Sequence, residues 1–426
     1  MDYCGLAVAE SLEFVAANLT NKTVTTSTQI QLSDRVAGLA PSATLAMVQR
    51  VKDLRDQGVN VLGLTAGEPD FAPPRVAEEA GIDAIRKGMG RYTAAAGTME
   101  LRQAVVEHIR RDIGLEYAPS EIVVTNGAKI GISQALLALV QKGDEVLVPY
   151  PCWTSYPEMV KLAEATPVMV PSDAQQFPDM KLLEEARTER TRAILLNTPN
   201  NPTGAVYPEA VLKELGEWAL ANDIAVISDE IYAALTYEGV QHVSPLKACP
   251  ALRETSVWIG GMSKAYAMTG WRMGFLAAAQ PLAKKIAGLQ SQLSGSPCAI
   301  SQHASMVALQ EADEPREEMR QAFERRRRIV IEAFEKIDGV NVALPDGAFY
   351  AFPALGKYAG RTCPDTGKQI NNGDDFIEAL LEADQVAGVA GSAFNQPDSF
   401  RISFAVADDV LVEALKRITN RFAKLV

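Results

Sequence analysis

The stretch Val257–Gly274 reads VWIGGMSKAYAMTGWRMG, and it shows how the middle of the chain is organised. Its first three residues are apolar and predict a buried strand, which the glycine pair behind them ends. Lys264 then stands among small and apolar residues. Such surroundings disfavour a charged ammonium, so they lower the pKa of the lysine and free its amine to act as a nucleophile. Arg272 follows eight residues later and carries a fork of donors that suits a phosphate.

Taken alone, this stretch also fits a solvated loop lysine beside a surface arginine. The segment Gly261–Ala265 further resembles the nucleophile elbow of α/β-hydrolases, which need an acid and then a histidine downstream of the serine. No Asp or Glu lies between Lys264 and His303, the only later histidine. The order of residues along the chain therefore excludes the hydrolase interpretation.

Seven short apolar runs alternate with helical segments, and they decide the fold class. They lack the polar–apolar alternation of half-exposed strands, so they predict an α/β protein with a mostly parallel sheet buried on both faces. Ligands of such sheets bind beyond the carboxyl ends of the strands, and the residues directly after each run are the candidates for a site. The runs are Ile122–Val124, Val146–Val148, Val168–Val170, Ala193–Leu196, Ile224–Ile227, Val257–Ile259 and Gly274–Ala277.

The sheet is expected to belong to a large domain formed by residues 76–314. Residues 31–75 and 315–426 are expected to form a smaller α+β domain, and residues 1–30 a poorly ordered N-terminal extension or a short appended helix. The smaller domain should contain three strand segments and a closing helix, at Val340–Phe352, Val386–Val389, Phe400–Ala405 and Asp408–Lys424.

Composition narrows the partners. The chain has 426 residues and a formal net charge of −12, which argues against a nucleic-acid partner and against an anionic membrane surface. Four consecutive arginines, Arg325–Arg328, are flanked by glutamates and predict a solvated helix face. The chain has five scattered cysteines without a CxxC pair and three histidines, so neither a disulfide framework nor a metal site is expected.

The location of the protein is expected to be cytoplasmic. No apolar run in the sequence approaches the length of a membrane span. Residues 1–30 are rich in Ser and Thr but contain acids and a single base, Lys22, whereas an organellar targeting segment is basic and poor in acids. Organellar targeting by this segment stays open.

Polar and small residues follow several of the predicted strands. Gly127, Ala128 and Lys129 open a helix after the first strand, and the free N–H groups of a helix N-terminus suit a phosphate. The segment matches neither the dinucleotide nor the P-loop glycine pattern. Trp153, in the loop after the second strand, can stack on a planar ring or fill a core. Asn201 lies in a polar, proline-rich turn that presents amide donors.

Asp229 comes two residues after the fifth apolar run, behind Ser228. A carboxylate at the end of a buried strand is costly unless a cation pairs with it, and a pyridinium N–H would be such a partner. Ionised Asp229 would then keep the ring protonated, which makes the ring an electron sink. Tyr232 can reach the phenolic oxygen of that ring. Together with the amine of Lys264 and the phosphate clamp of Arg272, these residues point to pyridoxal 5′-phosphate (PLP).

Three segments of the chain resemble those of a known family. The segments Ser263–Arg272, Asn200–Gly204 and Ser228–Tyr232 are similar to the signatures of class I (fold type I) PLP-dependent aminotransferases, in the bacterial-type subgroup of aspartate and prephenate aminotransferases. The resemblance runs from about Leu32 to the C-terminus. It implies a homodimer with shared active sites, with amino acids and 2-oxo acids as small-molecule substrates.

The resemblance also implies a role for each site residue. Lys264 would form the Schiff base with PLP, Asp229 would pair with the ring nitrogen, and Trp153 would stack on the ring. Asn201 and Tyr232 would bind the phenolic oxygen. The phosphate would be held by the turn at Gly127 and by Ala128, Lys129, Ser263 and Arg272, with Tyr92 reaching it from the partner subunit. Arg401 would hold the substrate α-carboxylate with a backbone contact from Gly67, and Lys129 and Thr44 would recognise the distal carboxylate of a dicarboxylic substrate.

The implied reaction is amino transfer between aspartate or glutamate and a 2-oxo acid, namely oxaloacetate, 2-oxoglutarate or prephenate. Two segments depart from the family pattern: Gly131 replaces a larger residue, and Ala72-Pro73-Pro74 differs from the usual turn on the substrate side. Three alternatives stay open. An aminotransferase for aromatic or neutral amino acids and a PLP-dependent lyase would keep the cofactor residues, and a PLP-binding regulator would need an added DNA-binding module.

Overall fold

The computed structural model describes residues 30–41 and 43–426. The chain divides into two compact units, Met1–Gly38 and Leu39–Val426. The expectation for the extension falls almost entirely on residues 1–29, outside the described residues. Within the described part of the first unit, α2 (Asp34–Ala37) is a single helical turn.

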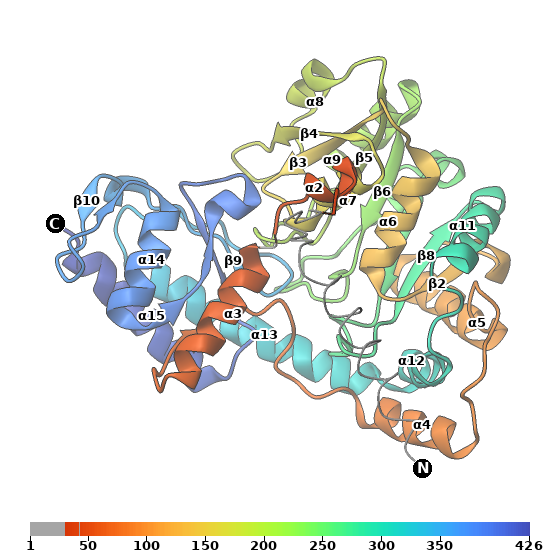
Figure 1. Cartoon of the computed structure of the whole chain (residues 1–426), viewed down its shortest axis with the longest axis horizontal. Coiled ribbons are helices and arrows are strands. Elements are labelled where there is room, and N and C mark those ends of the chain that lie inside the picture. The colour runs from red at the N-terminus through yellow and green to blue at the C-terminus, as the bar shows by residue number, and fades with distance from the viewer. Residues whose placement is uncertain (1–29, 42) are drawn as a thin grey trace, which may run out of the picture. The chain divides into compact units, whose positions relative to one another are not determined.

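A sheet of seven strands forms the centre of the second unit, in the order β2-β8-β7-β6-β5-β3-β4 (Figure 1). Every strand is parallel to its neighbours except β8, which is antiparallel to both β2 and β7. All seven predicted strands are confirmed. Their bounds are β2 (Ile122–Thr125), β3 (Glu145–Tyr150), β4 (Thr166–Pro171), β5 (Thr191–Asn197), β6 (Ala225–Asp229), β7 (Val257–Gly261) and β8 (Gly274–Ala278).

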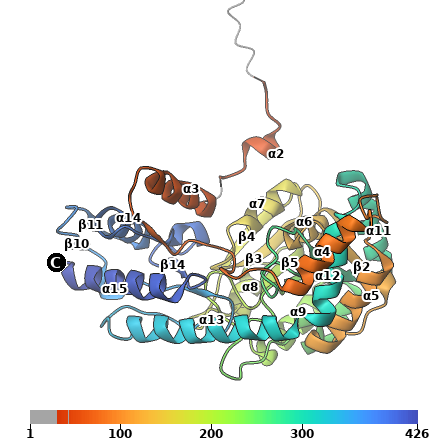
Figure 2. The ribbon, with the colours of Figure 1, turned by 90° about the horizontal axis from the view of Figure 1, so that it is seen from below.

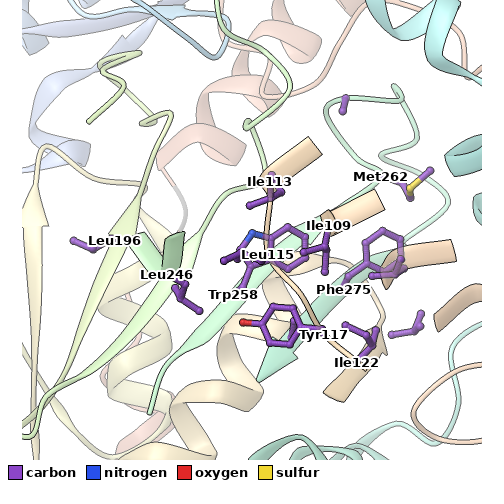
Figure 3. Close-up of a cluster of buried hydrophobic side chains, with 14 of the residues drawn as sticks. Ile109, Ile113, Leu115, Tyr117, Ile122, Leu196, Leu246, Trp258, Met262 and Phe275 are labelled. Carbon is purple, nitrogen blue, oxygen red and sulfur yellow. The ribbon is translucent and has the colours of Figure 1, made fainter. Parts of the chain in front are cut away.

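Helices bury both faces of this sheet, as the uninterrupted apolar runs predict. Successive residues of one strand point to opposite faces, so Val226 and Trp258 join one core cluster while Ile227 and Ile259 join the other. The first cluster, shown in Figure 3, lies under α5 (Met99–His108), α8 (Met180–Ala186), α9 (Glu209–Ala221), α10 (Pro245–Ala248) and α12 (Ala299–Glu311). The second lies under α6 (Ala128–Leu139), α7 (Ser155–Leu162) and α11 (Gln280–Leu293). The helix α4 (Arg75–Arg86) packs on α12.

A second core lies at the C-terminal end of the chain. The long helix α13 (Asp313–Phe334) extends to it and packs along the closing helix α15 (Asp408–Lys424), which begins and ends as predicted (Figure 2). A three-stranded antiparallel sheet, β13-β14-β9, contributes to this core. The division into a large and a small domain at residues 75 and 314 stays a prediction. The remaining elements are α3 (Ala43–Asp56), α14 (Gly373–Asp384), β1 (Leu62–Gly63), β9 (Tyr350–Ala351), β10 (Arg361–Thr362), β11 (Gln369–Ile370), β12 (Val386–Ala387), β13 (Val389–Ala390) and β14 (Phe400–Ser403).

Two of the predicted strand segments in this part are wrong in detail. Only Tyr350–Ala351 of the expected segment Val340–Phe352 is a strand, because the residues before it bond to turns. The amide of Gly347 donates to the carbonyl of Gly204, and Pro345 has no N–H to donate. The segment Val386–Val389 divides at Gly388, since β12 pairs with β1 while β13 pairs with β14.

The prediction of a solvated arginine face is wrong for the middle two residues of Arg325–Arg328. Arg326 is 6% exposed and Arg327 is 1% exposed. Arg326 bridges Asp70 and Asp408, with N–O distances of 2.7 Å to each. Arg327 pairs with Glu238 at 2.9 Å. Arg326 is therefore paired with Asp70 and Asp408, which belong to other segments, and not with the flanking glutamates that suggested a solvated face.

Candidate active site

A cavity of about 740 Å³ opens beyond the carboxyl ends of β5, β6 and β7, where sequence reasoning places the site. The N-terminus of α6, the helix α3 and the strand β14 complete its walls. Twelve of the fourteen predicted site residues line it. They are Thr44, Gly67, Ala128, Lys129, Trp153, Asn201, Asp229, Tyr232, Ser263, Lys264, Arg272 and Arg401.

Lys264 stands in the loop between β7 and β8 and points its amine across the cavity. The amine donates a hydrogen bond to the carbonyl oxygen of Gly67 and lies 5.9 Å from the ring centre of Tyr232. Burial lowers the pKa of Lys264 to about 8, against the opposing effect of Glu68. At this pKa roughly a fifth of the amine is neutral at pH 7.4, far more than for an ordinary lysine, and the neutral form is the one that nucleophilic attack and proton acceptance require.

Asp229 ends β6 and is 3% exposed. The hydroxyl of Tyr156 donates to its carboxylate at 2.6 Å, and the amide of Ile231 donates at 3.2 Å. Burial raises the pKa of Asp229 to about 6, and the bond from Tyr156 works against this shift. The carboxylate is consequently ionised at neutral pH and buried, and no cation among the described residues is bonded to it, so a cationic N–H group would match it.

Two glycines, Gly127 and Gly274, allow other groups to approach the first turn of α6 closely. Gly127 caps the helix at φ +88°, and a Cβ there would lie 2.7 Å from Nη2 of Arg272. Gly274, at the start of β8, lies so close to this turn that a Cβ on Gly274 would be 2.3 Å from the amide nitrogen of Ala128. Free helix amides and a guanidinium thus meet in one place and form a cradle that would suit a phosphate. Gly127 is therefore part of this cradle without lining the cavity itself.

Arg272 is held in an unusual backbone conformation beside this cradle. Its φ is +54°, in the left-handed region that residues with a side chain rarely adopt. Its Nη1 donates to the carbonyl of Thr269 at 2.9 Å. Lys129 adds a second positive charge, with its Nζ 4.7 Å from the ring centre of Trp153 and 3.1 Å from the Ser155 hydroxyl. Burial and the charge of Arg272 lower the pKa of Lys129.

Arg401 is buried on β14 at 1% exposure. Its guanidinium donates to the side-chain oxygen of Asn201 at 2.9 Å and to the carbonyl of Thr65 at 3.0 Å, and it lies 4.4 Å from the ring centre of Tyr350. Its Nε has no hydrogen-bond partner in the part of the chain that the structure describes. A buried donor without a partner is costly, and a carboxylate bound beside it would satisfy it.

Two predicted residues lie apart from the cavity lining. Gly127 belongs to the phosphate cradle, as described above. Tyr92 is 97% exposed, in the segment between α4 and α5, and it does not line the cavity. Its assigned role across a subunit interface stays a prediction.

Sequence reasoning missed two tyrosines that support the site. Tyr156 lies on α7 and holds Asp229, and Tyr350 lies on β9 and bonds to the hydroxyl of Tyr232 at 2.9 Å. Neither follows a strand of the large sheet directly, so the rule of strand ends could not find them. The available signal was weak: Tyr156 comes three residues after Trp153 in the same segment.

Comparisons with known proteins agree with this architecture. The family model described as aminotransferase class I and II matches residues 59–418. The chain is 41% identical to an aspartate aminotransferase of Geobacillus stearothermophilus over 395 residues, covering 92% of this chain and 99% of that protein. It is 42% identical to a bifunctional aspartate aminotransferase and glutamate/aspartate-prephenate aminotransferase of Petunia hybrida, covering 91% of this chain and 82% of that protein. The crystal structure of the aspartate aminotransferase of Rhizobium meliloti superposes with a TM-score of 0.90 at 39% identity, covering 93% of this chain and all of that one.

The fold and the cavity define a PLP-dependent transferase of fold type I. The chain belongs to the class I and II aminotransferase family, and it is an aminotransferase that depends on PLP. The residues present fit this cofactor: a cradle of helix amides and Arg272, a buried carboxylate without a bonded cation, and an amine of lowered pKa share one cavity. The predicted enzyme class, cofactor and fold are thereby confirmed.

Two further observations concern partners. Among the described residues, no helix is both long and apolar enough to cross a membrane. Within the same residues, no group of three or more His, Cys, Asp or Glu side chains is arranged to hold a metal ion.

Proposed function

We propose that the enzyme transfers the amino group of aspartate or glutamate to a 2-oxo acid, with oxaloacetate and 2-oxoglutarate as acceptors and prephenate as a further candidate. One observation carries this proposal. The buried guanidinium of Arg401, with its unpartnered Nε, shares the cavity with the amine of Lys264 and with a second cation, Lys129. Two cations on the walls of one cavity suit a substrate with two carboxylates. The names of the similar proteins point the same way.

The cofactor would be held by groups from successive strand ends. In this proposal Ala128, Ser263, Arg272 and the backbone amide of Lys129 bind the phosphate, with the turn at Gly127 giving access to it. Trp153 stacks on the ring, Asp229 pairs with the ring nitrogen, and Asn201 and Tyr232 bind the phenolic oxygen. When bound, PLP supplies an aldehyde that condenses with amines and a protonated ring that withdraws electrons from the substrate's α-carbon.

Lys264 then has two tasks in turn. In this proposal its amine would hold the cofactor, and when it is free it would move a proton to and from the substrate α-carbon. Its lowered pKa makes more of the amine neutral, and so able to accept that proton, than in an ordinary lysine. The carbonyl oxygen of Gly67 accepts a hydrogen bond from this amine and so orients the amine within the cavity. Asp229 stays ionised and thereby favours a protonated ring.

Substrate orientation follows from the two cations. Arg401 binds the α-carboxylate in a fixed position, because Asn201 and the carbonyl of Thr65 already hold its guanidinium. Lys129 and Thr44, which line the cavity from α6 and α3, bind the distal carboxylate in this proposal. A neutral or aromatic substrate would leave the ammonium of Lys129 without a carboxylate, which costs affinity.

We further propose a homodimer with shared active sites, located in the cytoplasm. Support for a subunit interface comes from large apolar side chains that are exposed in the single chain. They include Ile85 at 63%, Met99 at 48% and Leu293 at 58%, beside the fully exposed Tyr92. Cys152, Cys249, Cys298 and Cys363 are free thiols, which suits a reducing compartment.

The substrate class is tested by half-reactions. The PLP-loaded enzyme is mixed in turn with aspartate, glutamate, alanine and phenylalanine, and the loss of the cofactor absorbance and the product acid are measured. We expect aspartate and glutamate to react fastest and to yield their 2-oxo acids. The variant Lys129→Ala should lose at least about tenfold in rate constant per KM for aspartate, as the loss of a charged contact predicts, and little for alanine. The exposed Lys142→Ala serves as the control.

Two outcomes would contradict the proposal. Fast reaction with alanine or phenylalanine but not with aspartate would overturn the dicarboxylate preference. Elimination products in place of 2-oxo acids would favour the lyase.

A further inference from the structure

A cluster of buried polar side chains lies directly behind Asp229, and the proposed mechanism does not use it. Glu230 has a fully buried side chain. One of its oxygens accepts hydrogen bonds from the hydroxyls of Ser228 and Ser244, both at 2.7 Å. Its other oxygen lies 2.6 Å from Nε2 of His242, whose side chain is 4% exposed. We call these four residues the Glu230 cluster.

The Glu230 cluster and the Asp229 carboxylate lie on opposite faces of the sheet. Side chains alternate along a strand, so Asp229 points toward Tyr156 on α7, while Ser228 and Glu230 point toward the loop that leads into α10. Asp229 thus lies between Ser228 and Glu230, and the carboxylate of Glu230 holds both of these residues in place on the opposite face of the sheet.

The anchoring reaches the Asp229 carboxylate through the backbone. The amide of Glu230 donates to the carbonyl of Ile259 on β7 at 2.9 Å, which fixes the peptide plane before it. The next amide, that of Ile231, donates to the carboxylate of Asp229 at 3.2 Å. A turn of the peptide at Glu230 would therefore move one of the two donors that orient Asp229.

Stability alone does not account for a glutamate at this position. Burying an ionised carboxylate is expensive, and apolar residues of similar volume commonly stabilise a core as well or better. Four polar side chains bonded to one another instead fix a single geometry. Such a fixed geometry is useful where a neighbouring group, here the Asp229 carboxylate, has to be held in one orientation.

We propose that Glu230 is a positioning residue, which holds the end of β6 through Ser228, Ser244 and His242 so that the Asp229 carboxylate faces the ring nitrogen of bound PLP. The proposal rests on the pairing of Asp229 with that nitrogen. It adds that this pairing depends on side chains on the opposite face of the sheet, which touch neither cofactor nor substrate. Replacement of Glu230 should weaken the recognition of the ring nitrogen and of no other part of the cofactor.

The test compares two cofactors. Equilibrium binding to the cofactor-free protein is measured for PLP and for its analogue with carbon in place of the ring nitrogen, which cannot pair with Asp229. The parent should prefer PLP. In Glu230→Gln, which keeps the volume but removes the charge, this preference should fall about tenfold, as expected for a misaligned bond to a charged group. The affinity for the analogue should stay within about twofold of the parent, since its other contacts are unchanged.

Glu145→Gln is the matched control. Glu145 is also a buried carboxylate, 5% exposed, and it accepts a hydrogen bond from Thr188 at 2.6 Å, but it lies at the opposite end of its strand from the cavity. It should leave the preference for PLP unchanged. If Glu230→Gln does not fold, Ser244→Ala removes one bond of the Glu230 cluster and should lower the preference in the same direction.

The outcomes separate two failures. If the parent prefers PLP and Glu230→Gln keeps that preference, or loses affinity for both compounds equally, Glu230 is merely structural and the proposal is overturned. If the parent itself binds both compounds equally well, the pairing of Asp229 is wrong, and both the assignment and this proposal fall.

Discussion

Asp229 shows at the scale of one residue how function opposes stability in this site. Its carboxylate is buried, and its bonds come from neutral donors, Tyr156 and the amide of Ile231. Burial raises its pKa from 3.8 to about 6. Between these two values the folded chain binds more protons than the unfolded chain, so the free energy of unfolding falls as the pH rises through this range. The cost is fully present at neutral pH unless a cation is bound.

Asp229→Asn should therefore stabilise the cofactor-free protein. At pH 8 its free energy of unfolding should exceed that of the parent by up to about 3 kcal/mol, from a difference of about two pKa units. The gain should shrink as the pH falls toward 4. Urea unfolding of both proteins at pH 5 and pH 8 measures this. A variant less stable than the parent at pH 8 would contradict it, while added PLP should stabilise the parent more than the variant.

Single residues of the site were predictable where they directly follow a strand. Asp229 comes two residues after one apolar run, and Lys264 comes shortly after the glycine pair that ends another, so the sequence places both at the edge of the sheet. Arg401 was found only through the resemblance, since nothing local distinguishes it from a surface arginine. Tyr156 and Tyr350 were missed, because their contacts with Asp229 and Tyr232 depend on tertiary packing.

At the scale of elements, the turn from β2 into α6 carries the proposed phosphate cradle. Gly127 there combines a positive φ with close approach to Arg272. Either feature alone would favour glycine, so their effects have to be separated. Gly143 supplies the comparison, because its φ is +96° and a Cβ there would meet nothing within 4 Å.

Gly127→Ala should cost both stability and cofactor affinity, whereas Gly143→Ala should cost stability alone. Backbone strain at positive φ amounts to about 1 kcal/mol in each variant. In Gly127→Ala the new methyl group also displaces the guanidinium of Arg272, and we expect the dissociation constant for PLP to rise by about tenfold or more. Thermal unfolding and equilibrium titration with PLP give the two quantities. Equal PLP affinity in the two variants would show that the close approach has no role in the cradle.

Elements differ in how well the sequence predicts them. The seven strands of the large sheet were correct because each contains an apolar run of its own, in a sheet that helices cover on both faces. The two-residue strands β9, β12 and β13 were not, since they are set by pairing with distant segments and not by their own composition. The prediction that the arginines of α13 are solvated was wrong for the same reason, because the acidic partners of Arg326 and Arg327 come from distant segments of the chain.

At the scale of the molecule, the site combines segments far apart in sequence. Gly67, Lys264 and Arg401 line one cavity within a single chain. Tyr92 does not, and its side chain is fully exposed. Sequence reasoning assigned it to the site of a partner subunit, which a single chain cannot test.

Mixing two defective chains tests the shared site. Tyr92→Ala should bind PLP weakly and Lys264→Ala should be inactive. In a mixed dimer one site carries both defects and the other carries none, so activity should rise above that of either variant. Lys264→Ala mixed with Asp229→Asn is the control: both changes affect the chain's own site, and no gain is expected. Co-expression with two affinity tags isolates the mixed dimers. No gain in the first mixture would place Tyr92 outside the partner's site.

The guanidinium of Arg401 has one further consequence. Asn201, the carbonyl of Thr65 and the ring of Tyr350 hold it from three separate segments before any substrate arrives. The rotamer entropy of an arginine side chain, about 2 kcal/mol, is therefore lost when the chain folds and not when the substrate binds. Substrate association has to order only the substrate itself, and the substrate carboxylate meets a partner that is already rigid.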